Sequence, residues 1–78
     1  MTIKLCATVS YSGYDRAKDD VIREVASQSG AYDEVGSGFN LIDKIRDLEF
    51  EVVPGRRAEF ERAMTSLGWT VVFDDCDE

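Results

Sequence analysis

The order of hydrophobic patterns along the chain constrains its fold more than any other feature of the sequence. Residues 3–10 alternate between apolar and polar side chains, which predicts a strand with one buried face. Residues 14–29 instead repeat apolar side chains at helical spacing, with Ser12 as a start signal and Gly30 as a stop signal. The chain is therefore expected to open with a strand followed by a helix.

A β-hairpin is predicted in the middle of the chain. Apolar residues recur at alternate positions on both sides of Asp43. A turn around Asp43 would pair Phe39 with Leu48 and Val35 with Val52, so that both apolar sets lie on the same side of the sheet. The hairpin would then bury one face and leave the other polar.

A second helix and a final strand complete the pattern. Pro54 interrupts the hairpin strand, residues 56–67 show an apolar stripe at helical spacing, and residues 69–73 alternate again. This order predicts one domain over residues 1–78 with an α+β, ferredoxin-like βαββαβ sandwich, in which two helices cover one face of a four-stranded antiparallel sheet. The expected strand order is 4-1-3-2, so the first and third strands are central.

The chain is strongly acidic, and its charge limits the partners that it can have. Nine basic and 16 acidic residues give a net charge of −7. Direct binding to nucleic acid needs clustered lysine and arginine, so it is not expected. An acidic surface suits a basic protein surface, because complementary charge speeds association and disfavours wrong partners. The alternative is that the acidity serves solubility alone.

The polar positions of the strands predict the composition of the face that the helices leave open. On the two central strands these positions hold Cys6, Thr8, Glu49 and Glu51. RNA-recognition domains of this fold stack bases on aromatic side chains there, so that function is excluded. The loop after the first strand, "SYSGYDR", lacks the glycine-rich pattern with which acylphosphatases close on phosphate, although small regulatory ferredoxin-like domains bind amino acids at this loop.

No catalytic or metal-binding constellation stands out. The sequence has no histidine, and its two cysteines, Cys6 and Cys76, lie near opposite ends of the chain, so free thiols are expected and a zinc site has no plausible ligand set. Glu49 and Glu51 have the spacing of a paired-carboxylate site, but an open sheet lacks the enclosed cleft that acid–base catalysis uses. We therefore expect a non-enzymatic protein with no metal and no other cofactor.

The segment Gly36-Ser37-Gly38 resembles part of a phosphate-binding loop but fits that function poorly. A phosphate loop joins a strand to a helix and continues with further glycines or a Gly-Lys-Ser/Thr ending. This segment instead follows a helix, leads into a hairpin and continues Phe-Asn-Leu-Ile. Glycine on the open face of an edge strand indicates a bulge or the close approach of another backbone. A contact with a protein partner is therefore predicted for Gly36 and Gly38.

The remaining residues predicted to contact a partner are acidic. Residues 74–78 carry four negative charges in five positions. On its own this segment is typical of a frayed, solubilising tail. Together with acids of the hairpin it would form a patch that competes with nucleic acid for a basic groove. The predicted partner-binding residues are Asp33, Glu34, Gly36, Gly38, Glu49, Glu51, Asp74 and Asp75.

The small size, the acidity, segments such as "LEFEVV" and "FDDCDE", and the lack of a catalytic motif together resemble phage-encoded anti-CRISPR proteins. Proteins of that group block bacterial RNA-guided surveillance complexes, often at nucleic-acid-binding surfaces. The resemblance implies an inhibitor whose partner is a bacterial Cas protein. With no signal peptide or membrane span predicted, the expected location is the host cytoplasm, and a monomer is favoured. Two alternatives remain: a ligand-binding or dimerising regulatory domain, and an antitoxin or immunity protein.

Overall fold

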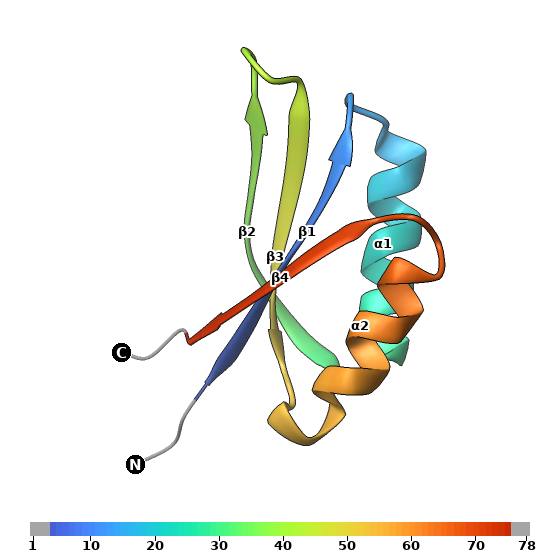
Figure 1. Ribbon diagram of the computed structural model, residues 1–78, viewed down its shortest axis with the longest axis vertical. Coiled ribbons are helices and arrows are strands. Elements are labelled where there is room, and N and C mark those ends of the chain that lie inside the picture. The colour runs from blue at the N-terminus through green and yellow to red at the C-terminus, as the bar shows by residue number, and fades with distance from the viewer. Residues whose placement is uncertain (1–3, 76–78) are drawn as a thin grey trace.

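The computed structural model describes residues 4–75, and its elements follow the predicted order. The elements are β1 (Leu5–Ser12), α1 (Arg16–Gln28), β2 (Ala31–Asn40), β3 (Ile45–Val52), a short 3-10 turn (Pro54–Arg56), α2 (Arg57–Thr65) and β4 (Thr70–Asp75). The strands pair antiparallel in the order β2-β3-β1-β4, and both helices lie on one side of the sheet (Figure 1). The expected α+β ferredoxin-like fold is confirmed, with β1 and β3 as the central strands.

The hydrophobic core lies between the sheet and the two helices. Its buried members are Leu5, Ala7, Val9 and Tyr11 of β1, Leu48, Phe50 and Val52 of the hairpin, Ile22 and Ala26 of α1, and Phe60 and Met64 of α2. Phe60 is fully buried, and its ring lies 6.3 Å from that of Phe50 and 6.1 Å from that of Phe73. The alternation along β1 and β3 therefore buries one face of the sheet, as the sequence predicted.

The first helix begins later than its predicted start. β1 continues through Ser12, so Ser12 belongs to the strand and does not cap the helix. Asp15 takes the capping position instead, and its carboxylate accepts a hydrogen bond of 2.9 Å from the Ala17 N–H. At the other end the chain leaves the helix through Gly30, whose φ of +116° strongly favours glycine.

The hairpin register differs from the predicted one by two residues at its tip. Phe39 lies opposite Arg46 rather than opposite Leu48. The turn closes earlier because the side-chain oxygen of Asn40 accepts hydrogen bonds from two N–H groups of the turn, and because Lys44 adopts a positive φ of 58°. A shift of two residues keeps each side chain on its original face, so the core face of the hairpin tip is unchanged.

Two bulges in the first half of β2 make the rest of the hairpin register differ from the predicted one. One follows Ala31 and the other follows Glu34, and each adds to β2 a residue that has no opposite residue in β3. Val35, which was expected to face Val52 in the core, is consequently 41% exposed, and Ala31 lies opposite Val52 instead. The bulges also turn Glu34 toward the helix side, opposite Phe50.

Candidate functional site

The open face of the sheet carries a row of carboxylates along the central strand β3. Asp47, Glu49 and Glu51 alternate with buried residues and are themselves half-buried. Alternate residues of a strand lie about 6.6–6.8 Å apart, so the row spans about 13 Å. It therefore repeats negative charge along a line, as a nucleic-acid strand does with one phosphate per nucleotide.

Two further carboxylates flank this row. Asp33 of β2 lies opposite Glu51, and Asp74 of β4 lies opposite Cys6, which in turn lies opposite Glu51. Among residues 4–75, Lys4 is the one cation that forms a salt bridge with this group, at 3.8 Å from Glu51. We call the five carboxylates the acidic face; its members are Asp33, Asp47, Glu49, Glu51 and Asp74.

Hydrogen bonds hold part of the acidic face in place. The Ser10 hydroxyl donates to Asp47 Oδ1 at 2.7 Å. Desolvation and a hydrogen bond with Glu51 raise the pKa of the Tyr32 hydroxyl. A carboxylate has about four lone-pair sites, so both acids can still accept hydrogen bonds from a partner.

Beside the carboxylate row, β2 presents backbone instead of side chains. Gly36 lies opposite Glu49, and Gly38 lies opposite Asp47. A depression of about 320 Å³ is lined here by Thr8, Gly36, Ser37, Gly38, Asp47 and Glu49. A Cβ atom at Gly36 would lie 3.5 Å from Glu49 Oε1, whereas one at Gly38 would meet no atom within 4 Å. We call the surface over Gly36 and Gly38 the glycine trench; it leaves the carboxylate row open toward the edge of the sheet.

The structure brings together six of the eight residues predicted to contact a partner. The six on the open face are Asp33, Gly36, Gly38, Glu49, Glu51 and Asp74. The other two lie on the helix side: Glu34 forms an ion pair of 2.8 Å with Arg23 of α1, and Asp75 lies opposite the core residue Leu5. β4 extends to Asp75, and the rest of the predicted acidic tail lies outside the described residues.

Sequence reasoning missed Asp47. The apolar residues that predict the second strand of the hairpin begin at Leu48, whereas β3 begins three residues earlier, at Ile45. The signal was present in the alternation, because Asp47 has the same parity as Glu49 and Glu51. With Asp47 included, the row of carboxylates runs along most of β3.

Cys6 corrects a second expectation. It lies on the open face between Glu51 and Asp74, but it is only 3% exposed and is disulfide-bonded. The predicted free thiol is therefore wrong at this position, because separation along the chain does not decide whether two cysteines meet in the fold. Cys76, the other cysteine of the sequence, lies outside the described residues.

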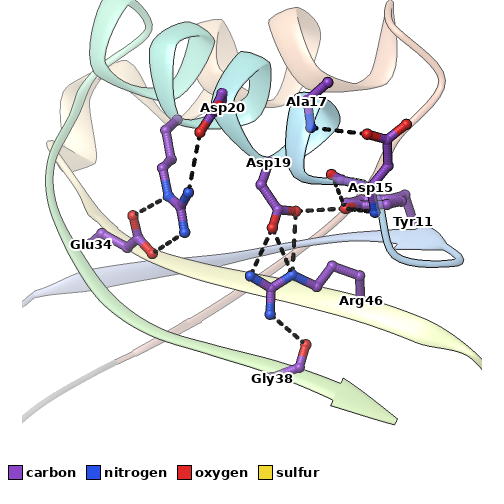
Figure 2. A network of polar contacts seen from close by, with 9 residues as sticks. Tyr11, Asp15, Ala17, Asp19, Asp20, Glu34, Gly38 and Arg46 are labelled. Atoms are coloured by element: carbon purple, nitrogen blue, oxygen red, sulfur yellow. Dashed lines mark hydrogen bonds and ion pairs between the residues drawn. The ribbon is translucent and has the colours of Figure 1, made fainter. Parts of the chain in front are cut away.

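A polar cluster lies on the opposite, helix-covered side of the hairpin (Figure 2). Arg46 of β3 is 7% exposed, and its Nε and Nη2 donate to both carboxylate oxygens of Asp19 of α1 at 2.8–3.2 Å. Arg46 also donates to the Gly38 carbonyl at 3.3 Å, and the Tyr11 hydroxyl donates to Asp19 at 2.5 Å. In the part of the chain that the structure describes, every buried side-chain nitrogen and oxygen atom has a hydrogen-bond partner.

The electrostatics of this cluster keep both ions charged. Burial raises the pKa of Asp19, but the hydrogen bonds from Arg46 and Tyr11 outweigh it and leave that pKa below its ordinary value. The hydrogen bond with Asp19 likewise raises the pKa of Arg46. The ion pair between Asp19 and Arg46 links α1 to β3, and it therefore stabilises the strand on which Asp47, Glu49 and Glu51 lie.

The acidic face is spread along the sheet instead of converging on a point. Among residues 4–75, no three His, Cys, Asp or Glu side chains come together in a way that would hold a metal ion. The same residues form no helix with both the length and the apolar character needed to cross a membrane. The chain matches no protein-family model and no curated protein sequence. What its geometry offers is an extended, negatively charged surface.

Proposed function

We propose that the protein is a small, non-enzymatic inhibitor that binds a basic, nucleic-acid-binding surface of another protein through its acidic face. The observation that carries the proposal is the row of Asp47, Glu49 and Glu51, flanked by Asp33 and Asp74, on a sheet face that no helix of residues 4–75 covers. This arrangement is complementary to a groove lined with lysine and arginine. It supports occupation of such a groove in place of a nucleic-acid strand.

The resemblance to anti-CRISPR proteins supports, as the partner, a Cas protein of a bacterial surveillance complex. In this form of the proposal the inhibitor competes with the guide or target strand for one basic groove. Complementary charge would supply fast association and specificity, so no catalytic step is needed. Binding would weaken as salt rises, because ions screen charge pairs at a surface.

Charge reversal tests the proposed function. The test variant carries Glu49→Lys, Glu51→Lys and Asp74→Lys on the acidic face. A matched control reverses three exposed acids on the helices: Asp20→Lys, Glu24→Lys and Glu61→Lys. Both variants change the net charge equally, so any difference in displacement between them comes from the positions of the reversed charges. The assay measures displacement of labelled nucleic acid from purified nucleic-acid-binding Cas subunits, and circular dichroism verifies that each variant is folded.

The wild-type chain and the control should displace the nucleic acid, and the test variant should be weaker by at least about tenfold, or about 1.4 kcal/mol. Equal displacement by the folded test variant would refute the role of the acidic face. Absence of displacement by the wild-type chain would refute the proposal that the partner is a Cas protein.

The alternative of a ligand-binding regulatory domain is favoured by one observation. A depression of about 440 Å³ lies at the end of β1, beside the loop where such domains bind amino acids, and its lining includes Ser12, Lys18 and Trp69. A thermal-shift screen with free amino acids tests it. A rise in melting temperature that grows with ligand concentration would support a regulatory domain, and no rise with any amino acid would count against it.

A further inference from the structure

The outer edge of β2 is open to an added strand. Among residues 4–75, β3 is the one strand that pairs with β2, which forms an end of the sheet (Figure 1). Such an edge presents backbone N–H and C=O groups with which an extended chain can pair. The two bulges disturb the first half of β2, whereas residues 36–40 pair with β3 in an uninterrupted register. This second half is therefore the part with the geometry to accept a strand.

The glycine trench connects this edge with the carboxylate row. A strand added to β2 would lie about 4.7–4.9 Å from it, and thus about 9.4–9.8 Å from β3. At most positions a side chain on β2 would stand between the added strand and β3. At Gly36 and Gly38 no side chain does so, and the residues across the trench are Glu49 and Asp47. A lysine or arginine side chain, with its long aliphatic stem, can lie over the glycines and place its charge at these carboxylates.

We propose that residues 36–40 of β2 accept an extended, basic segment of the partner as a fifth strand. Basic side chains at alternate positions of that segment cross the glycine trench to Asp47 and Glu49. The spacing agrees, because the two glycines, the two carboxylates and alternate residues of the added strand all repeat at about 6.6–6.8 Å. Backbone pairing supplies affinity, and the carboxylates select a basic segment over an acidic one. This inference rests on the proposed function and specifies which part of the partner is bound.

The other edge of the sheet lacks this combination. β4 fills its open face with side chains at Thr70, Val72 and Asp74, and Val72 is 58% exposed. The strand that pairs with β4 is β1, and the residues of β1 on the open face are uncharged: Cys6, Thr8 and Ser10. A basic strand added to β4 would therefore face no carboxylate row. The preference for β2 is a prediction that a direct binding experiment can examine.

The experiment uses the full chain, labelled with nitrogen-15, and a short synthetic peptide in which lysine alternates with valine or threonine. A second peptide replaces every lysine with glutamate. At low salt, the lysine peptide should cause saturable shift changes at the amides of residues 36–40 and at Asp47 and Glu49, and it should slow hydrogen exchange along the β2 edge. The glutamate peptide should cause neither effect.

Gly38→Val gives the sharpest variant. Valine suits a strand, and its Cβ meets no atom at this position, so the variant should stay folded while its side chain blocks the trench. We expect the affinity for the lysine peptide to fall by at least about tenfold. Thr70→Val, a similar change on the β4 edge, is the matched control and should leave the affinity unchanged.

Three results would overturn the inference: no saturable shift changes with the lysine peptide, changes centred on β4, or unchanged affinity in folded Gly38→Val. The displacement assay distinguishes a failure of the strand-addition proposal from a failure of the proposed function. If the charge-reversed variant loses displacement while Gly38→Val retains it, the acidic face binds the partner without strand addition. If neither variant loses displacement, both proposals are wrong.

Discussion

Replacing Arg46 with methionine should destabilise the domain strongly. The substitution keeps much of the side-chain length but removes the guanidinium that contacts both oxygens of Asp19, which is only 2% exposed. Leaving one member of a buried ion pair without its partner typically costs about 3–5 kcal/mol. A domain of this size has a total stability of roughly 4–12 kcal/mol. The variant should therefore lose a large part of its stability and unfold at a much lower urea concentration.

Trp69 provides the assay, because it is the only tryptophan in the sequence and packs against the core. Urea unfolding followed by its fluorescence gives the free energy of unfolding for each variant. The double variant Asp19→Leu with Arg46→Met removes both charges, so it should recover most of the loss. If the double variant does not regain stability, the single variant is destabilised by lost packing and not by an unpaired buried charge.

The pH dependence gives a second readout with a defined sign. In the wild-type protein the pKa of folded Asp19 lies below its unfolded value, so the contribution of the ion pair is present at neutral pH and is lost as pH falls through the folded pKa. In Arg46→Met, burial without the guanidinium should raise the pKa of Asp19 above its unfolded value, so acid relieves the penalty. The difference in unfolding free energy should shrink from about pH 7 to about pH 3. A difference below about 1 kcal/mol at neutral pH, or one that does not change with pH, would refute the reasoning.

Three further substitutions test the core and two backbone positions by the same urea assay. Phe60→Ala should cost about 3–5 kcal/mol, because it empties a fully buried site between the sheet and α2; a cost below 1 kcal/mol would mean that the site collapses around the alanine. Gly30→Ala should cost about 1–3 kcal/mol, because φ is +116° and the new Cβ would lie 2.8 Å from Arg56 Cβ. Gly13→Ala, with φ of +86° and no neighbouring atom within 4 Å, should cost less; equal costs would show that the contact with Arg56 is unimportant.

The fold could be predicted because each element carries its own periodicity. Alternation in β1 and β3 and helical spacing in α1 and α2 are local properties, and their order leaves few ways to cover one sheet with two helices. The same alternation places Glu49 and Glu51 on the open face, which the register confirms. Five of the six predicted contact residues that lie together do so for this reason, whereas Asp33 reaches the open face because of the bulge after Glu34.

The details that failed depend on contacts that a local pattern does not contain. A bulge inserts one residue and inverts the side chains beyond it as far as the next bulge. Asp33 and Glu34 therefore lie on the faces opposite to those that alternation predicted, and Val35 is exposed instead of buried. The pairing of Asp19 with Arg46 joins residues 27 positions apart, and neither neighbourhood indicates a buried charge. Both features arise from tertiary packing, which sequence periodicity does not encode.

The ion pair between Asp19 and Arg46 has a consequence for how the sequence can evolve. A single substitution at either position leaves a buried charge without its counterion, whereas exchange of both for apolar residues restores a compatible interior. The two positions should therefore change together among descendants of this chain, through intermediates that other stabilising substitutions keep folded. Lineages should retain both charges or neither, whereas the loss of one carboxylate from the acidic face would leave no unpaired charge in the interior.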